Sequence, residues 1–291
     1  MAVQSISVLN QRTYEANLRS LSQQRGSKLR QFTIERHEPN MHLWDRIAQL
    51  PFGATGLNAR VSGGATPEVQ ATIDRRRTTP AAYDVGHLVD PDDVANVTLD
   101  PKSAILQEQA NVIGRKFDDI IITAALGATL AEDGTSTAFP TATQSLGSAT
   151  QPFDFNFITS VNEKFWVNNV PTDEEKVFVI RPNGAKKLLQ MTQATSSDYV
   201  MAQALASTGY VENWLGYTWI VSNLLPNVAG LQYYYLAMTK RAMGLHITKD
   251  IWSRVSESTE KSFAWRVYSA FSAGAVRIED EHVVRAWVLE S

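Results

Sequence analysis

Residues 100–127 read DPKSAILQEQANVIGRKFDDIIITAALG, and this stretch predicts one long helix around which the fold is organised. Asp100 suits the N-cap, where a carboxylate accepts hydrogen bonds from free backbone amides, and Pro101 suits the first helical position, where no N–H is needed. Gly127 can take the left-handed conformation that ends many helices. Apolar residues recur at spacings of three to seven and predict a stripe that lies on another element: Ile105, Val112, Phe117, Ile120 and Ala124.

The predicted helix over residues 101–126 is about 39 Å long, which favours a spine for a broad, flat body. Gly114 in its middle costs about 1 kcal/mol relative to alanine unless close packing requires it. Arg115 can pair along the helix with Asp118 or with Asp119, three and four residues further on. The two aspartates occupy adjacent positions that point apart, so they are expected to be solvated rather than to act as a catalytic pair.

Composition limits the class of protein. The chain has 291 residues, of which 44% are hydrophobic, and this is enough for one large or two ordinary domains with a core. It has no cysteine, which excludes disulfides, thiolate metal sites and cysteine nucleophiles. The net charge of −3 argues against a surface that grips nucleic-acid phosphates as a whole. No apolar run approaches the roughly 20 residues of a membrane span and signal-peptide features are lacking, so no membrane partner is expected.

Residues 1–50 predict an N-terminal arm made of two short helices with an extended piece between them. Tyr14 lies on the apolar face of the first helix, and Trp44 lies on that of the second, over residues 43–50. An arm this irregular needs a surface to lie on, so both aromatic residues are expected to contact a neighbouring subunit.

Residues 51–95 predict an extended hairpin loop, because frequent glycines interrupt scattered Val, Ile and Thr, with the turn near Gly63 to Pro67. A hairpin of this length is marginal in water alone and needs cover from its own body or from another subunit. The run of three arginines on the returning strand is a solvated basic face, a set of ion pairs with carboxylates of a neighbouring subunit or, as the minor alternative, a phosphate contact. The hairpin residues expected at a subunit interface are Arg60, Glu68, Asp74, Arg75, Arg76 and Arg77.

A compact α/β domain is predicted over residues 153–231, after a polar loop that ends near Pro152. Short apolar strands alternate with helices in this part of the chain. The expected elements are a helix capped by Asp154, a strand at Val177–Ile180, a helix opened by Pro182, a helix at Asp198–Ala206 and a strand at Gly216–Asn223.

Strands dominate the chain from residue 232 onward, and several alternate apolar and polar residues with a period of two. These returning strands are expected to form the sheet under the long helix. Residues 96–152 and 232–291 therefore make one predicted domain, into which residues 153–231 are inserted, and the predicted fold class is α+β.

Catalytic and metal-binding patterns are missing from the sequence. It has no GxSxG nucleophile elbow, phosphate-binding loop, dinucleotide fingerprint or HExxH helix. His37 and His42 are five residues apart, a poor spacing for one helix face, so packing is expected rather than metal binding. The acidic run Glu279, Asp280 and Glu281 is expected to be a solvated turn between strands. No catalytic residue, cofactor or metal is predicted, and the chain is not expected to be an enzyme.

Several segments follow one another in a recognisable order. They are the RRR run at 75–77, the acidic VDPDD at 89–93, the DPKS and GRKFDDIIITAALG ends of the helix, VFVIRPNGAKKLL, GYTWIVSNLLP and AFSAGAVRIEDEHVVRAWV. This order resembles that of the major capsid proteins of tailed double-stranded DNA bacteriophages. The resemblance implies an α+β fold with an N-terminal arm, an extended hairpin loop that lies over a neighbour, a peripheral domain with a spine helix, and an inserted axial α/β domain.

The resemblance also implies a structural function. Copies of the chain would form the pentamers and hexamers of an icosahedral head, which encloses double-stranded DNA without sequence-specific binding. The implied partners are a separate scaffolding protein, a portal and a decoration protein; the implied location is the virion capsid, assembled in the host cytoplasm. Some members cross-link through a lysine of the extended loop, but no lysine lies between Lys28 and Lys102, so a non-covalent shell is expected. The alternatives are an encapsulin-like cellular nanocompartment shell and an α/β enzyme with an unrecognised site.

Overall fold

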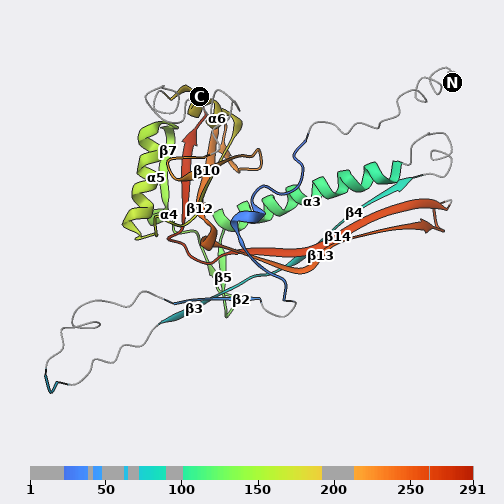
Figure 1. Ribbon diagram of the computed structural model, residues 1–291, viewed down its shortest axis with the longest axis horizontal. Helices are drawn as coiled ribbons and strands as arrows, with labels where there is room; N and C mark the ends of the chain where they lie inside the picture. Colours follow the sequence, from blue (N-terminus) through green and yellow to red (C-terminus); the bar gives the residue numbers. More distant parts are fainter. Residues whose placement is uncertain are drawn as a thin grey trace.

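The computed structural model describes residues 23–38, 42–47, 62–64, 72–89, 101–191, 213–261 and 263–290, with side chains from residue 105 in the long helix. The described part is α+β, as predicted, and contains two four-stranded sheets and one seven-stranded sheet. Figure 1 shows the long helix and its sheet extending away from the domain that holds the seven-stranded sheet.

The long helix α3 (Pro101–Leu126) matches the predicted helix and lies on one of the four-stranded sheets. Its buried face includes Phe117, whose ring centroid lies 4.6 Å from that of Phe271 on the sheet. Val112, predicted for the buried face, is instead 41% exposed, because the stripe runs through its neighbour Ile113. The strands of this sheet, in spatial order, are β1 (Ile34–Arg36), β13 (Met243–Ser258), β14 (Ala264–Arg277) and β4 (Ala81–Val89).

Two glycines of the helical stretch behave differently. A Cβ on Gly114 would lie 2.3 Å from the carbonyl carbon of Gly26, so close packing requires glycine there, which is one of the two readings that the sequence leaves open. The predicted left-handed cap at Gly127 is wrong, since this residue has no positive φ. Its N–H donates to the Thr123 carbonyl at 2.9 Å, which continues the helical hydrogen-bond pattern by one residue.

The seven-stranded sheet contains the strands predicted for the inserted domain, near 177–180 and 216–223. Helices α5 (Phe155–Val167) and α6 (Pro182–Gln190) also match the predictions, and Asp154 caps α5 by accepting a hydrogen bond from the Phe157 N–H at 2.8 Å. The predicted helix at 198–206 lies outside the described residues. The order of the strands is β7 (Ser145–Pro152), β15 (Val283–Leu289), β12 (Gln232–Thr239), β8 (Lys176–Ile180), β10 (Tyr217–Val221) and β9 (Asn213–Trp214), with β11 (Asn227–Ala229) beside β12.

The prediction that all returning strands lie under the long helix is wrong for β12 and β15. Both belong to the seven-stranded sheet, where β15 pairs with β12 on one side and with β7 on the other. Only β13 and β14 of the returning strands lie in the sheet under α3. Alternation along a strand shows that one face is buried but not which sheet the strand joins, so the sequence pattern was insufficient.

A second four-stranded sheet forms the base of the hairpin. Strand β2 (Leu43–Ile47) pairs antiparallel with β3 (Ile73–Arg77), from Leu43 opposite Arg77 to Ile47 opposite Ile73. Residues 43–47 are therefore a strand and not the predicted helix, and the hairpin starts within the predicted arm. The predicted turn is supported at residues 62–64, whereas Tyr14, Arg60 and Glu68 lie outside the described residues. The sheet is completed by β5 (Thr129–Ala131) and β6 (Ser136–Thr137), and the predicted polar loop also contains α4 (Thr141–Gln144).

Two short 3₁₀ helices complete the described elements. One, η1 (Arg30–Phe32), precedes β1, and the other, η2 (Lys240–Ala242), links β12 to β13. Because β12 and β13 lie in different sheets, η2 is one of the places where the chain crosses between them. The second is the segment from Ile278 to His282, which links β14 to β15.

Candidate functional site

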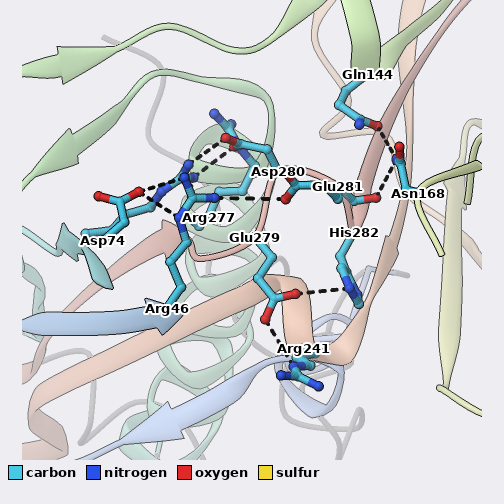
Figure 2. A network of polar contacts seen from close by, with 11 residues as sticks. Arg46, Asp74, Gln144, Asn168, Arg241, Arg277, Glu279, Asp280, Glu281 and His282 are labelled. Atoms are coloured by element: carbon cyan, nitrogen blue, oxygen red, sulfur yellow. Dashed lines mark hydrogen bonds and ion pairs between the residues drawn. The ribbon is translucent and has the colours of Figure 1, made fainter. Parts of the chain in front are cut away.

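The link between β14 and β15 gathers charged residues from several elements. We call residues 279–282 the acidic turn. It is closed by a hydrogen bond from the Val283 N–H to the Asp280 carbonyl, at 3.1 Å. Figure 2 shows the side chains of the acidic turn pointing in different directions, with Asp280 toward Arg277 and Glu279 toward Arg241. The acidic turn therefore contacts several parts of the molecule at once.

Asp280 is the centre of a largely buried ionic cluster. Arg76 on β3 donates to both of its carboxylate oxygens, at 2.5 and 2.8 Å, and Arg277 donates through Nε at 2.5 Å. The Asp280 side chain is 17% exposed, and that of Arg76 only 5%. Burial alone would raise the pKa of Asp280, but the hydrogen bonds from the two guanidinium groups outweigh it and lower the pKa to about 2. The sequence-based expectation of a solvated acidic run is therefore wrong for Asp280.

Arg277 ties this cluster to the long helix. Its side chain is fully buried, and Nη1 donates to the carbonyl oxygens of Ala125 at 2.9 Å and Gly127 at 2.8 Å. These carbonyls lie at the C-terminal end of α3, where helix carbonyls lack partners and the dipole favours a cation. Burial lowers the pKa of the Arg277 guanidinium, although Asp280 acts in the opposite direction. The Arg277 guanidinium thus binds carbonyl oxygens at the end of α3, where the sequence predicts a left-handed cap at Gly127.

The backbone carbonyl of Glu281 and the side chain of His282 contact the connection between α5 and β8. Asn168, which caps the end of α5, donates through Nδ2 to the Glu281 carbonyl at 3.0 Å, as Figure 2 shows. His282 Nδ1 lies 3.2 Å from the Glu174 carboxylate, and His282 Nε2 lies 3.0 Å from that of Glu279. The hydrogen bond from His282, assisted by Arg241, lowers the pKa of Glu279 although burial opposes it.

The hairpin arginines are separated by the alternation of β3. Arg75 and Arg77 are exposed, and Arg75 pairs with Asp45 at 2.8 Å and with Glu132 at 3.1 Å. Arg76 points to the other side of the strand and is buried on Asp280, so its partner lies in the same chain and the predicted intersubunit pair is wrong for this residue. Asp74 pairs with Arg46 of β2 at 2.6 Å.

Trp44 is also an internal residue and not the predicted intersubunit contact. It is 2% exposed and lies opposite Arg76 in the pairing of β2 with β3. Its indole Nε1–H donates to the Thr78 hydroxyl at 2.9 Å, and its ring occupies the space that a Cβ on Gly244 would fill. The physical reason for the error is the strand conformation of residues 43–47, which turns this side chain inward.

The helix ion pairs predicted for Arg115 are wrong as well. Asp118 is fully buried and accepts hydrogen bonds from the backbone N–H groups of Lys28 and Leu29, at 3.1 and 3.0 Å. Asp119 pairs with Lys116 at 2.6 Å, while Arg115 donates to Gln23 at 2.5 Å. Asp118 and Arg115 thus hold residues 23–29 across α3, a role for which the sequence offers no local signal.

Large exposed apolar side chains mark three separate ends of the described molecule. Ile47 and Ile73, which face each other in the hairpin base, are 69% and 59% exposed. Phe263, at the far end of the β13–β14 ribbon, is 62% exposed, and Trp166 at the end of α5 is 59% exposed. Figure 1 shows these elements pointing in different directions. Single exposed side chains such as Phe263 are normal on a protein surface, whereas the adjoining pair Ile47 and Ile73 is a small apolar patch of the kind that contact surfaces contain.

The described residues form no metal site and no membrane-spanning helix. Within those residues, no three His, Cys, Asp or Glu side chains gather in a way that would hold a metal ion. In the same part of the chain, no helix is both long enough and apolar enough to cross a bilayer. The site residues that sequence patterns missed are Arg46, Arg277 and Asp280. Arg277 and Asp280 are only three residues apart, but their contacts with Ala125 and Arg76 join distant parts of the chain.

Comparison with known proteins identifies the family. The sequence profile of the family described as "Phage capsid protein" matches residues 6–290. No curated protein sequence matches the chain. The fold is that of tailed-phage major capsid proteins.

Solved structures support the same assignment of fold at low sequence identity. A structure from Mycobacterium phage Che8 is 17% identical, with a TM-score of 0.68 over 94% of this chain and 97% of that one. The capsid of cyanophage P-SCSP1u is 16% identical, with a TM-score of 0.71 over 100% and 96%. The capsid of cyanophage Pam1 is 12% identical, with a TM-score of 0.65 over 100% and 99%. Because the family profile matches residues 6–290, the chain belongs to the phage capsid protein family.

Proposed function

We propose that this protein is the major capsid protein of a tailed phage. In this proposal, its copies form the pentamers and hexamers of an icosahedral head that encloses double-stranded DNA. The observation that carries the proposal is the family match over residues 6–290, nearly the whole chain. Membership of a phage capsid family favours this function over the cellular nanocompartment and over an unrecognised enzyme, because the family is one of structural proteins.

The exposed apolar ends support assembly. The pair Ile47 and Ile73 lies at the base of a hairpin whose two strands are already paired with each other and with β5. Burying such side chains against a second copy gains about 1.5–3 kcal/mol for each residue. Repetition of these modest contacts by symmetry stabilises a closed shell.

Charged residues of the hairpin supply the proposed specificity of subunit contacts. Arg75, Arg77 and Asp74 remain candidates for ion pairs with a neighbouring subunit, as do Arg60 and Glu68 outside the described part, while Tyr14, also outside it, remains a candidate for an apolar contact. Arg75 already has two exposed carboxylate partners in its own chain, and both pairs are weak enough in water to exchange for a partner in another subunit. The shell is proposed to be non-covalent, since the hairpin sequence has no lysine.

Other components of the particle are proposed from the family. A separate scaffolding protein would guide assembly in the host cytoplasm, a portal would occupy one vertex, and a decoration protein would bind outside. The net charge of −3 fits a wall that confines DNA without gripping its phosphates or reading its sequence.

Electron microscopy tests the function directly. The full chain is expressed alone and together with the neighbouring genes of its source, and the purified material is imaged. We expect closed shells tens of nanometres across in at least one of these preparations. Only discrete dimers or tetramers under every condition would overturn the proposal, and a protein cargo instead of DNA in native particles would favour the nanocompartment.

A further inference from the structure

The two places where the chain crosses between the sheets are bonded to each other. The Ile278 N–H donates to the Ala242 carbonyl at 2.7 Å, and the Thr239 N–H donates to the His282 carbonyl at 3.1 Å. Arg241 of η2 adds a side-chain contact to Glu279 at 3.1 Å. Two covalent crossings joined in this way resist twisting more than either crossing alone, because bending one requires breaking bonds to the other.

The hairpin base is attached to this double crossing by both of its strands. From β3, Arg76 binds Asp280 through two parallel hydrogen bonds, a geometry that fixes orientation as well as distance. Arg76 Nη1 also donates to the Arg277 carbonyl at 2.8 Å, just before the acidic turn. From β2, Arg46 Nη1 lies 3.9 Å from the Glu281 carboxylate. Figure 2 shows Arg46 and Asp74 on the side of the cluster away from His282.

The inserted domain holds the opposite side of the acidic turn. Asn168 binds the Glu281 carbonyl, and Glu174 lies against His282; both residues belong to the connection between α5 and β8. Glu175 of the same connection accepts a backbone hydrogen bond from Lys240 of η2 at 3.2 Å. One short turn therefore has the hairpin base on one side and the inserted domain on the other.

We propose that the acidic turn is a rigid joint, so that the hairpin base and the inserted α/β domain move as one body, with Asp280 as the positioning residue. In the assembled shell, Asp280 would then set the direction in which the hairpin reaches its neighbour. This last step rests on the proposed function, whereas the joint itself is a property of the single chain.

Hydrogen exchange on the full chain before assembly tests the joint. Arg76→Met removes the bidentate contact, and Arg75→Met, at the next position of β3, is the matched control because its partners lie outside the acidic turn. We expect Arg76→Met to speed exchange by about tenfold both in β3 and in the connection over residues 168–175, with the middle of β13 and α3 unchanged. The control is expected to change residues 168–175 by less than about twofold.

Two outcomes would overturn the joint. In the first, exchange rises in β3 but stays unchanged over residues 168–175. In the second, exchange rises equally across the whole chain, which is the signature of a merely stabilising ion pair. If Arg76→Met fails to fold, Arg76→Lys, which keeps the positive charge but cannot make the two parallel hydrogen bonds, provides the same comparison.

Assembly of the same variants tests the positioning role. We expect Arg76→Met to give several-fold fewer closed shells than the wild type, with open or irregular particles in their place, while Arg75→Met keeps closed shells of normal shape even at reduced yield. If the wild type and Arg76→Met both form closed shells of normal number and shape, the positioning role is overturned and the proposed function stays intact. If the wild type forms no shells, the proposed function fails, and the exchange experiment still decides the joint.

Discussion

Asp280 provides one carboxylate for two buried guanidinium groups, those of Arg76 and Arg277. Buried charges are tolerated only when they are paired and hydrogen-bonded, and Arg277 reaches that state with the help of two carbonyl oxygens at the end of α3. Removal of the shared carboxylate would therefore leave two cations uncompensated, which is more damaging than the loss of an ordinary surface pair.

We expect Asp280→Asn to lower the free energy of unfolding of the unassembled subunit by about 3 kcal/mol at neutral pH. The matched control is Asp119→Asn, because the side chain of Asp119 is 42% exposed and its pair with Lys116 is solvated. The control is expected to cost less than about 0.5 kcal/mol. Urea denaturation followed by tryptophan fluorescence measures both, and equal losses in the two variants would contradict the assignment.

The same carboxylate predicts acid sensitivity. The folded-state pKa of Asp280 is about 2, below the ordinary value of 3.8, so its stabilisation is present above the ordinary value and is lost as the pH falls through the folded value. The loss amounts to about 2 kcal/mol. Unfolding free energies measured from about pH 5 to about pH 2 are expected to fall more steeply for the wild type than for Asp280→Asn. Parallel curves would show that Asp280 does not titrate in this way.

At the scale of elements, α3 is held by contacts on two sides. The sheet covers its apolar face, and residues 23–29 cross it where Gly114 allows the backbone of Gly26 to approach. Asp118 then fixes that crossing through the N–H groups of Lys28 and Leu29. The direction in which the chain enters the fold therefore depends on one glycine and one carboxylate of the helix.

Gly114→Ala tests this crossing. Alanine usually gains about 1 kcal/mol over glycine inside a helix. Here the new Cβ would lie 2.3 Å from backbone of Gly26, so we expect a net loss of about 2 kcal/mol and faster tryptic cleavage at Arg25 and Lys28. Gln107→Ala, at an exposed position of the same helix, is the control and should leave both measurements unchanged. A stabilised Gly114→Ala variant would show that the crossing is not tight.

Neighbouring arginines of β3 have different kinds of partner. Arg76 is buried on Asp280 of its own chain, whereas the exposed Arg75 and Arg77 are expected to contact a neighbouring subunit. The double variant Arg75→Gln and Arg77→Gln changes only exposed side chains of β3, so we expect the unfolding free energy to change by less than about 0.5 kcal/mol. Shell yield in electron micrographs is expected to fall, because ion pairs with the neighbouring subunit are lost. Normal yield would exclude these arginines as interface residues. Arg76 is left unchanged in this variant. Because Arg76 stabilises the subunit itself, its loss would lower the unfolding free energy as well as the shell yield.

At the scale of the whole molecule, the described part of the chain has two sheets linked by the acidic turn, a third sheet at the hairpin base, and parts that project from them. Figure 1 shows the β13–β14 ribbon with α3, the hairpin strands and the inserted domain extending from a common junction. The acidic turn lies at that junction, where the chain passes from one sheet to the other. In the proposed shell, the exposed apolar side chains at these projecting ends would be buried against copies of the chain.

Such a shell is expected to be held together without covalent bonds. When purified particles are boiled in detergent and run on a denaturing gel, we expect one band at the mass of the single chain, 32.3 kDa. The hairpin has no lysine through which subunits could be cross-linked, and the chain has no cysteine that could form a disulfide. A ladder of multiples of that mass would contradict the non-covalent shell.

The sequence by itself determined features that depend on near neighbours along the chain. The long helix, the Asp154 cap of α5 and the strand at 177–180 all follow from spacing and capping chemistry within a few residues. The need for Gly114 does not, because it arises from the close approach of the Gly26 backbone, which is distant in the chain. The order of these segments was also sufficient to suggest the family. The second predicted helix of the arm failed because helical spacing of Leu43, Trp44 and Ile47 also fits a short strand with one buried aromatic residue.

Tertiary structure alone decided which strands share a sheet and which charges are buried. Arg76 and Asp280 are separated by 204 residues, and Asp118 and Leu29 by 89, so no local pattern distinguishes them from solvated neighbours such as Arg75 and Asp119. Strand alternation shows that one side of β3 faces inward, but the carboxylate it meets depends on how two sheets are joined. The physical reason is that capping and periodicity are properties of local backbone geometry, whereas the burial of a charge depends on partners that only the complete fold brings together.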